Sequence, residues 1–183
     1  MAKCKACGSG GLFSRVDEVG LCPNCHHSYA LMSDSIRILQ DSLHLVEDSQ
    51  YLDTKISRCE TALDHIHRIL NLPNSVQIWH AFNPTMGLPE IASSIDEVLN
   101  DLQTVQVNLA ASILDLLRKG PSTQKGLYEV LESAFAKEGR PVDTLSFSVE
   151  KSLPNLLKQM EEKEMVSKSK SGRSYIYSIG NKQ

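Results

Sequence analysis

Apolar residues recur at helical spacing between Ser33 and Leu70, a stretch that contains no proline or glycine. One row of them has a period of seven, and a second row falls four residues after three members of the first, as in a helical seam. The rows are Ile38, Leu45, Leu52, Cys59 and Ile66, and then Ile56, Leu63 and Leu70. The pattern predicts a helical connector over residues 33–71, either one long helix or a helical hairpin broken near Ser49–Asp53.

A seam of this kind calls for a packing partner. We expect a coiled-coil or bundle contact that joins two copies of the chain into a homodimer through residues 36–70. The seam is weak in its first half, where Ser42 and Ser49 occupy the matching positions. A second stripe competes there, formed by Ile36, Leu39, Leu43 and Val46. The alternative is that these residues pack only inside their own chain. Cys59 then reads as a small buried hydrophobic residue.

Proline ends the connector, because Pro73 disfavours helical backbone in the residue before it. Residues 72–89 hold three prolines and the only tryptophan of the chain, Trp79. This composition predicts a linker in which Trp79 fills an apolar gap. A connecting helix over residues 90–108 is expected to follow it.

Residues 109–180 have the pattern of three helices followed by a β-hairpin. Lys119-Gly120-Pro121 ends the first helix, and the second ends near Gly139. Ser152 is the expected N-cap of the third helix, which places Pro154 in its first turn. Beyond Val166 serine and lysine alternate over residues 167–170, the chain turns at Ser171-Gly172, and it returns through Ser174–Ser178, as in a hairpin. The fold class expected for the whole chain is mainly α with small β elements.

Charge is divided unevenly along the 183 residues, whose net charge is −3. Residues 1–117 hold 7 Lys and Arg against 14 Asp and Glu, whereas residues 118–183 hold 12 against 8. A basic end is typical of nucleic-acid binding, and also of many ordinary solvated surfaces. No apolar run approaches the ~18 residues of a membrane span, and no targeting segment is visible. We therefore expect a cytoplasmic protein that does not enter a membrane.

Four of the five cysteines follow the spacing Cys-x2-Cys-x14-Cys-x2-Cys: Cys4, Cys7, Cys22 and Cys25. Each pair can fold as a tight knuckle that presents two thiolates to one ion, and four thiolates in a tetrahedron suit Zn²⁺. Residues 1–30 are therefore predicted to form a zinc ribbon with one structural zinc ion. A short hairpin is expected between the pairs, from Leu12–Val16 and Val19–Leu21.

The complete set of four thiolates leaves no position for water or substrate, so a structural metal is favoured over a catalytic one. His26 and His27 follow the last cysteine and can in principle replace a ligand, although four thiolates already suffice. Iron in a Cys₄ site and a redox dithiol are the alternatives to zinc. Disulfides are disfavoured because Cys59 would be left unpaired and no secretory signal precedes the cysteines.

The C-terminal segment resembles a known class of domain. Leu156–Val166, followed by the basic hairpin that ends Tyr175-Ile176-Tyr177-Ser178, looks like the winged-helix domain of PadR-type and penicillinase-repressor-like transcriptional regulators. Ile113–Ser122 is similar to the opening helix and turn of the same domain. The resemblance covers about 70 residues and implies that the third helix enters the major groove of DNA, its N-terminal residues nearest the bases.

The resemblance implies three groups of DNA contacts. They are Ser152, Asn155, Lys158 and Gln159 of the third helix, Lys168, Lys170 and Arg173 of the wing, and Thr123, Gln124 and Lys125 at the start of the second helix. The third helix has no arginine suited to bidentate guanine recognition, and winged helices also bind proteins.

The leading hypothesis is a DNA-binding transcriptional regulator or accessory factor. Its winged helix would bind double-stranded DNA, and its ribbon would dock DNA, RNA or protein. The alternative is a non-enzymatic scaffold that uses the ribbon, the helices and the winged helix for protein contacts. An enzyme is not expected, since the sequence has no nucleotide-binding Gly-rich loop, no nucleophile elbow and no open metal site.

Overall fold

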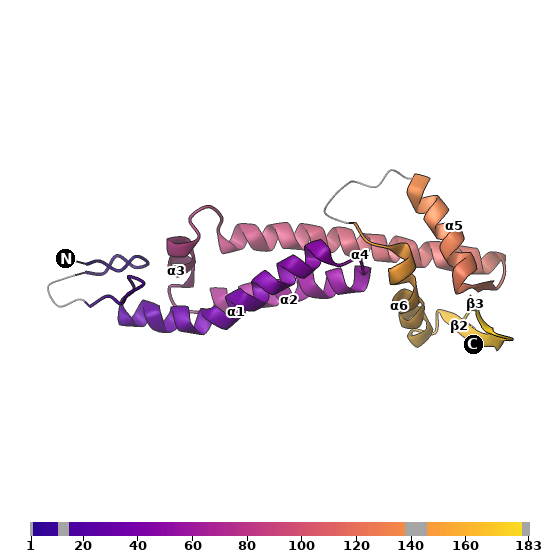
Figure 1. The fold of residues 1–183 in the computed structure, drawn as a ribbon, viewed down its shortest axis with the longest axis horizontal. Coiled ribbons are helices and arrows are strands. Elements are labelled where there is room, and N and C mark those ends of the chain that lie inside the picture. The colour runs from indigo at the N-terminus through magenta and orange to yellow at the C-terminus, as the bar shows by residue number, and fades with distance from the viewer. Residues whose placement is uncertain (1, 11–14, 138–145, 181–183) are drawn as a thin grey trace. The chain divides into compact units, whose positions relative to one another are not determined.

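The computed structural model describes residues 2–10, 15–137 and 146–180, and it is mainly helical with one small antiparallel sheet (Figure 1). This agrees with the predicted fold class. The chain divides into two compact units, one of Met1–Leu45 and Arg58–Leu99, the other of Val46–Ser57 and Asn100–Gln183. Within the described part, no helix combines the length and the apolar character needed to cross a membrane.

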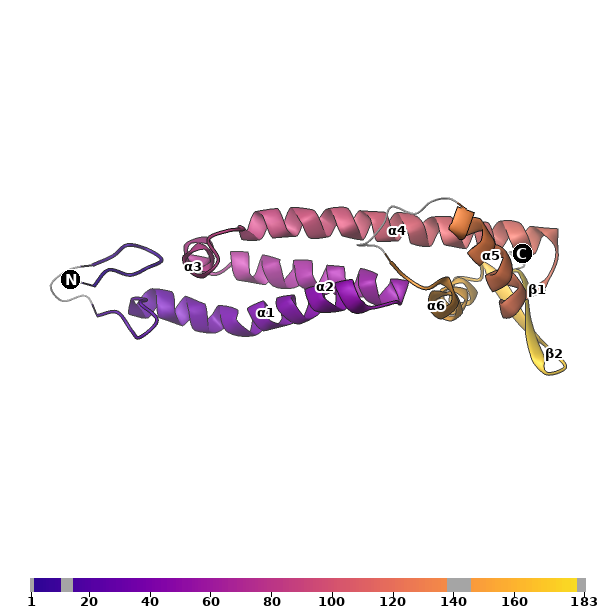
Figure 2. The same cartoon turned by 45° about the horizontal axis from the view of Figure 1, so that its top comes forward.

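The predicted connector consists of two helices and not of one. Helix α1 spans Pro23–Asp48 and helix α2 spans Leu52–Leu70. Between them the Ser49 hydroxyl accepts a hydrogen bond from the N–H of Tyr51 at 3.1 Å, a side-chain-to-backbone bond of the kind that competes with helix. In the first unit the two helices lie side by side, as both views show (Figure 2).

The predicted seam is buried along α2. Five of its six residues there are 9% exposed or less, and Leu70 is half-buried; the five are Leu52, Ile56, Cys59, Leu63 and Ile66. In α1 the seam residues Ile38 and Leu45 are only half-buried, whereas Leu39 of the competing stripe is buried. The α2 seam is thus covered inside a single chain. The homodimer stays a prediction, and it would have to use other side chains of residues 36–70.

The segment 72–89, which the sequence suggests is a linker, contains helix α3, Ser75–Phe82. Trp79 is 7% exposed, and its indole N–H donates to the carbonyl of Met86 at 2.9 Å. The ring of Phe82 lies 5.0 Å from that of Tyr29 in α1. The segment is therefore a packed part of the first unit, because both aromatic side chains anchor it.

Helix α4, Leu88–Lys119, extends through both the predicted connecting helix 90–108 and the predicted first helix of the winged-helix region. It is followed by β1 (Ser122–Thr123), α5 (Gln124–Lys137) and α6 (Val149–Glu162), and then by β2 (Val166–Ser171) and β3 (Ser174–Ile179). The sheet order is β1-β3-β2, with both pairs antiparallel. This succession of elements has the winged-helix arrangement, and its core includes Ile113, Leu127, Leu157 and Tyr177.

Helix α6 begins one turn earlier than expected. Its N-cap is Ser148, whose hydroxyl accepts the N–H of Lys151 at 3.2 Å. Ser152, the predicted cap, is buried inside the helix, and Pro154 lies beyond the first turn. Both serines have cap chemistry, but only Ser148 has the extended backbone of a cap, with φ −95° and ψ 121°.

Helix α6 ends in a Schellman motif. The N–H of Met165 donates to the carbonyl of Met160, and that of Glu164 to the carbonyl of Glu161, both at 2.9 Å. Glu164 has φ 58°, the left-handed conformation that glycine adopts without steric cost. The N–H of Gly180 donates to Met165 O at 2.9 Å, which ties the end of β3 to this turn.

Candidate metal centre and nucleic-acid interface

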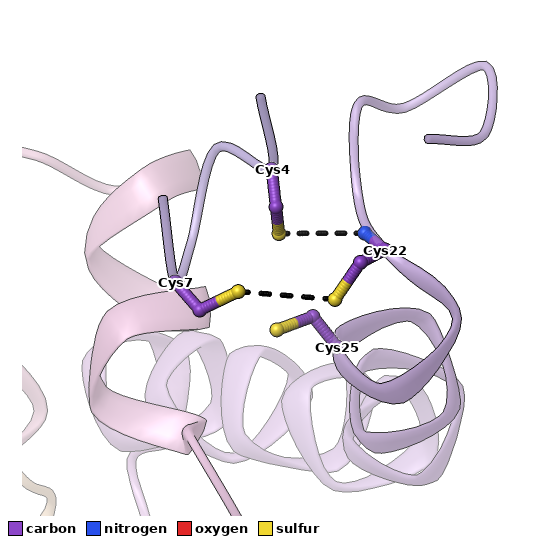
Figure 3. Close-up of side chains that lie close together, drawn as sticks. All are labelled: Cys4, Cys7, Cys22 and Cys25. Atoms are coloured by element: carbon purple, nitrogen blue, oxygen red, sulfur yellow. Dashed lines mark hydrogen bonds between the residues drawn. The ribbon is translucent and has the colours of Figure 1, made fainter. Parts of the chain in front are cut away.

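The two cysteine pairs are held by different local structures. In the first pair, the N–H of Gly8 donates to the carbonyl of Cys4 at 2.9 Å, and Gly8 has φ 70°. In the second pair, Cys22 precedes α1 and Cys25 lies in its first turn, where the N–H of His26 donates to Cys22 O at 2.8 Å. A glycine turn and a helix start therefore present the four sulfur atoms, which Figure 3 shows converging on one point.

The sulfur geometry fits a four-coordinate metal ion. All four Sγ atoms lie within 4.8 Å of one another, and those of Cys7 and Cys22 are 3.8 Å apart. A tetrahedron with Zn–S bonds of about 2.3 Å has edges of about 3.8 Å. Cys4 and Cys25 are buried, Cys22 is half-buried and Cys7 is exposed. The cluster can thus hold one metal ion, with two ligands shielded from solvent.

Backbone N–H groups favour the thiolate form of two cysteines. Burial by itself raises the pKa of the Cys4 thiol, but hydrogen bonds from the N–H groups of Cys7, Cys22 and Ala6 outweigh it and lower the pKa to about 6. The bond from Cys22 N to Cys4 Sγ measures 3.3 Å. The N–H of Cys25 likewise lowers the pKa of Cys22.

The pKa of Cys25 is shifted in the opposite direction from those of Cys4 and Cys22. Burial, followed by the neighbouring thiols, raises the pKa of its side chain. Without a cation, four close thiolates would repel one another, so Cys25 holds its proton. A bound divalent ion reverses that preference, because it attracts all four anionic ligands.

His26 is turned toward a carboxylate. Its Nδ1 lies within hydrogen-bonding distance of Asp17 Oδ2, and Asp17 Oδ1 accepts the N–H of Leu21 at 2.8 Å. The N–H of Leu21 and then His26 lower the pKa of Asp17. Asp17 thus links the segment before Cys22 to the first turn of α1, a role that was not among the sequence predictions. The signal for it was an Asp four residues before Leu21, at a turn.

The hairpin predicted between the cysteine pairs falls partly outside the described residues, which omit 11–14. In the described part, Asp17–Leu21 form a tight turn and no strand is present over residues 15–22. Lys3 and Gly10 form an isolated antiparallel bridge on the other side of the gap.

The β2–β3 hairpin, called the wing from here on, presents three exposed cations: Lys168, Lys170 and Arg173. Gly172 has φ 60° and Arg173 is not left-handed, so the two-residue loop is a type II′ turn. The wing contains no Asp or Glu, and none of its cations has a carboxylate partner among the described residues. Figure 2 shows the wing extending away from α5 and α6.

Aromatic rings lie beneath one wing cation. The ammonium of Lys168 is 4.2 Å from the ring centroid of Tyr175 and 5.8 Å from that of Tyr177. Lys168 pairs with Tyr177 and Lys170 with Tyr175 in the sheet register, so all four side chains share one face of the hairpin. The cation–π contact orients Lys168 without removing its charge.

The predicted contact residues at the start of α6 are engaged inside the protein. Ser152 is 3% exposed, and its hydroxyl accepts the N–H of Leu52 at 3.0 Å, so this side chain is buried and already bonded within the chain. Asn155 is exposed, yet its Nδ2 donates to Asp53 Oδ2 at 2.9 Å. Both partners belong to the first turn of α2.

The other predicted α6 contacts also have partners. Lys158 Nζ lies 3.8 Å from Glu162 Oε1, one turn along the helix. The side-chain oxygen of Gln159 accepts from Gln106 Nε2 at 3.4 Å. The outward face of α6 therefore offers DNA little that is unpaired.

At the start of α5, Thr123 Oγ1 accepts the N–H of Gly126 at 3.1 Å and so caps the helix. Gln124 and Lys125 are exposed, with Lys125 Nζ 3.8 Å from Glu129 Oε1. Of the three predicted groups, only the wing presents several cations with no carboxylate partner among the described residues.

Comparison with models of protein families, with curated proteins and with solved structures finds no match to this chain.

Proposed function

We propose that the protein is a DNA-binding transcriptional regulator or accessory factor, without enzymatic activity, whose second unit contacts double-stranded DNA. The observation that carries the proposal is the wing, with three exposed cations and no acidic residue on a winged-helix scaffold. Cations on a projecting hairpin neutralise phosphates and release condensed counterions, which supplies most of the affinity for any duplex.

The metal in this proposal is one structural Zn²⁺ ion at Cys4, Cys7, Cys22 and Cys25. Four thiolates close the coordination sphere, and zinc accepts a tetrahedron without any preference of its own for another geometry. Free thiols at these positions require a reducing compartment, in accord with a cytoplasmic protein. The ribbon would then serve as a rigid docking element for a protein partner.

A homodimer through residues 36–70 is a further part of the proposal. Because the α2 seam is buried, the dimer contact would have to use residues on the solvent side of α1 and α2. Sedimentation at micromolar concentration tests it, and a monomer would remove the dimer from the proposal without affecting DNA binding.

A scaffold is the second candidate function, favoured by a specific observation in the first unit. A pocket there is lined in part by Val76, Trp79 and Met86, and Val76 and Met86 are 48% and 54% exposed. Exposed apolar side chains around a pocket are typical of protein-binding surfaces. Val76→Asp tests this role.

Fluorescence anisotropy with a labelled duplex tests DNA binding. The metal-loaded full chain is titrated at about 50 and about 200 mM salt, where phosphate contacts make affinity fall steeply. The wing variant Lys170→Ala/Arg173→Ala is expected to lower the slope of log affinity against log salt by about 1.8. The control variant Arg37→Ala/Arg68→Ala makes the same change of charge at exposed sites of the first unit and should leave the slope unchanged.

A further inference from the structure

The N-terminal end of α6 is covered by the junction of α1 and α2, residues 50–53. The N–H of Ser148 donates to the carbonyl of Gln50 at 2.9 Å, and the side chain of Lys151 donates to Gln50 Oε1. Two further bonds, from the N–H of Leu52 to Ser152 and from Asn155 to Asp53, continue the contact along the helix. All these residues belong to the second unit.

The junction is itself firmly held. Leu52 is 2% exposed, and the fully buried side chain of Lys55 donates to the carbonyls of Val46 and Glu47 at the end of α1. These carbonyls lack partners within their own helix, and the Nζ of Lys55 satisfies them. Residues 50–53 are thus part of the packed unit and not a loose flap over α6.

This arrangement engages, inside the chain, several polar groups of the surface with which a winged helix ordinarily reads bases. Base edges in the major groove are contacted by residues at the start of the recognition helix, and here that end faces the chain's own junction. The other end of α6 carries three exposed carboxylates, Glu161, Glu162 and Glu164, against two exposed lysines, of which Lys158 is paired with Glu162 and Lys163 follows the helix. Carboxylates at this end repel the phosphates that a helix must pass to enter the groove.

We infer that the chain binds duplex DNA through the wing alone, by the phosphate backbone and without reading base sequence, and that α6 is a structural helix. This inference rests on the proposed function and specifies its ligand as a DNA duplex of any sequence. Lys168, Lys170 and Arg173 supply the contacts. Sequence-independent recognition follows because backbone contacts position a protein on DNA and carry no sequence information themselves.

A matched pair of variants tests the inference. Lys158→Gln on α6 and Lys170→Gln on the wing each remove one exposed cation. Both are compared with the wild type by anisotropy over a series of salt concentrations. Lys170→Gln is expected to lower the salt slope by about 0.9, whereas Lys158→Gln should leave it unchanged. An equal loss of slope in the two variants would overturn the inference.

Two duplexes of equal length and unrelated sequence complete the test. The wild type is expected to bind them with affinities within about threefold of each other, because specific recognition ordinarily exceeds non-specific binding by at least about 10³. Enrichment of one sequence from a random duplex library would overturn the inference and leave the proposed function intact. Absence of binding to every duplex at low salt would overturn both.

Release of the junction distinguishes a structural helix from a masked reading helix. Asp53→Ala removes the acceptor of Asn155 and weakens the cover over α6. The expected result is an unchanged ratio of affinities for the two duplexes. A ratio that rises in the variant would show that α6 reads bases once it is uncovered, contrary to the inference.

Discussion

The cysteine cluster and the wing both bring like charges together, but the cluster does so at a partly buried site and the wing on an exposed hairpin. The cluster brings four potential thiolates within 4.8 Å, half of them buried, so its full deprotonation requires a cation. The wing spreads three cations along an exposed hairpin, where water solvates each one. The deprotonated cluster is stable only when it holds a cation, whereas the charges of the wing need no bound ligand. Loss of one cysteine ligand should therefore unfold the metal-binding segment and leave the wing unchanged.

Cys22→Ser should have the largest effect. It removes one of four thiolates, and the remaining ligands no longer complete the tetrahedron. Structural zinc contributes on the order of 10 kcal/mol to the folding of small zinc modules, so the N-terminal segment is expected to unfold and release its metal. Metal content by mass spectrometry should fall from one ion per chain to almost none. DNA binding by the wing should persist, because the wing shares no ligand with the cluster.

Cys59→Ala is the matched control for that experiment. Cys59 is the fifth cysteine, 1% exposed and outside the metal cluster. The variant should keep one metal ion per chain, whatever it costs in packing. Full metal retention by Cys22→Ser, or metal loss from Cys59→Ala, would contradict the four-thiolate site.

Acid should weaken metal binding at the cysteine cluster. A thiol whose pKa is lowered on folding stabilises the fold above its ordinary pKa near 9 and loses this contribution as the pH falls through its folded value. For Cys4 that value is about 6, and protons then compete with the metal for the same sulfur atoms. A bound metal keeps the thiolates deprotonated below the pKa of the metal-free thiol, so metal release, followed with a chromogenic chelator, is expected only at a pH below about 6. Metal release at a pH well above 6 would contradict this account.

The same contrast explains what the sequence predicted. The cluster is local: its two pairs lie within Cys4–Cys25, and their spacing alone indicates the ligand set. The wing is local as well, since alternation around Ser171-Gly172 predicts a hairpin; the loop is Gly172-Arg173, one residue later than predicted, because Ser171 pairs with Ser174. The cover over α6 is not local, because it joins residues 50–53 to a helix about a hundred positions later, a contact with no short-range pattern.

Two other features escaped prediction for physical reasons. Ser148 and Ser152 have the same cap chemistry, and the choice between them depends on the tertiary bond from Leu52 to Ser152. Lys55 has an ionisable side chain and is fully buried, which no pattern of apolar residues anticipates; its role is set by the carbonyls at the end of α1. Helix α3 was missed because the prolines on either side of it suggested a linker.

Gly180→Ala should damage the second unit and leave the cluster intact. A methyl group at residue 180 would lie 2.0 Å from the carbonyl oxygen of Glu164, well inside contact distance, and that atom is backbone. The end of β3 must therefore shift, at a cost of about 2 kcal/mol, in the range of other overpacked sites. Chemical denaturation should show the lower stability, with metal content unchanged. Wild-type stability of Gly180→Ala would contradict the close contact between residue 180 and the Glu164 carbonyl.

Glu164→Gly should have the smallest effect and the opposite sign. Glu164 holds the left-handed position of the Schellman motif, which costs a residue with a Cβ about 1–2 kcal/mol. Glycine avoids that cost but loses more chain entropy on folding, which leaves a net gain of about 0.5–1 kcal/mol. Glu164→Ala removes the same carboxylate from the helix C-terminus and keeps the strained backbone, so it gains only the few tenths from the dipole. A larger denaturation midpoint for Gly than for Ala would assign the gain to backbone strain. Equal midpoints would assign it to charge, and the acidic end of α6 would then be its cause.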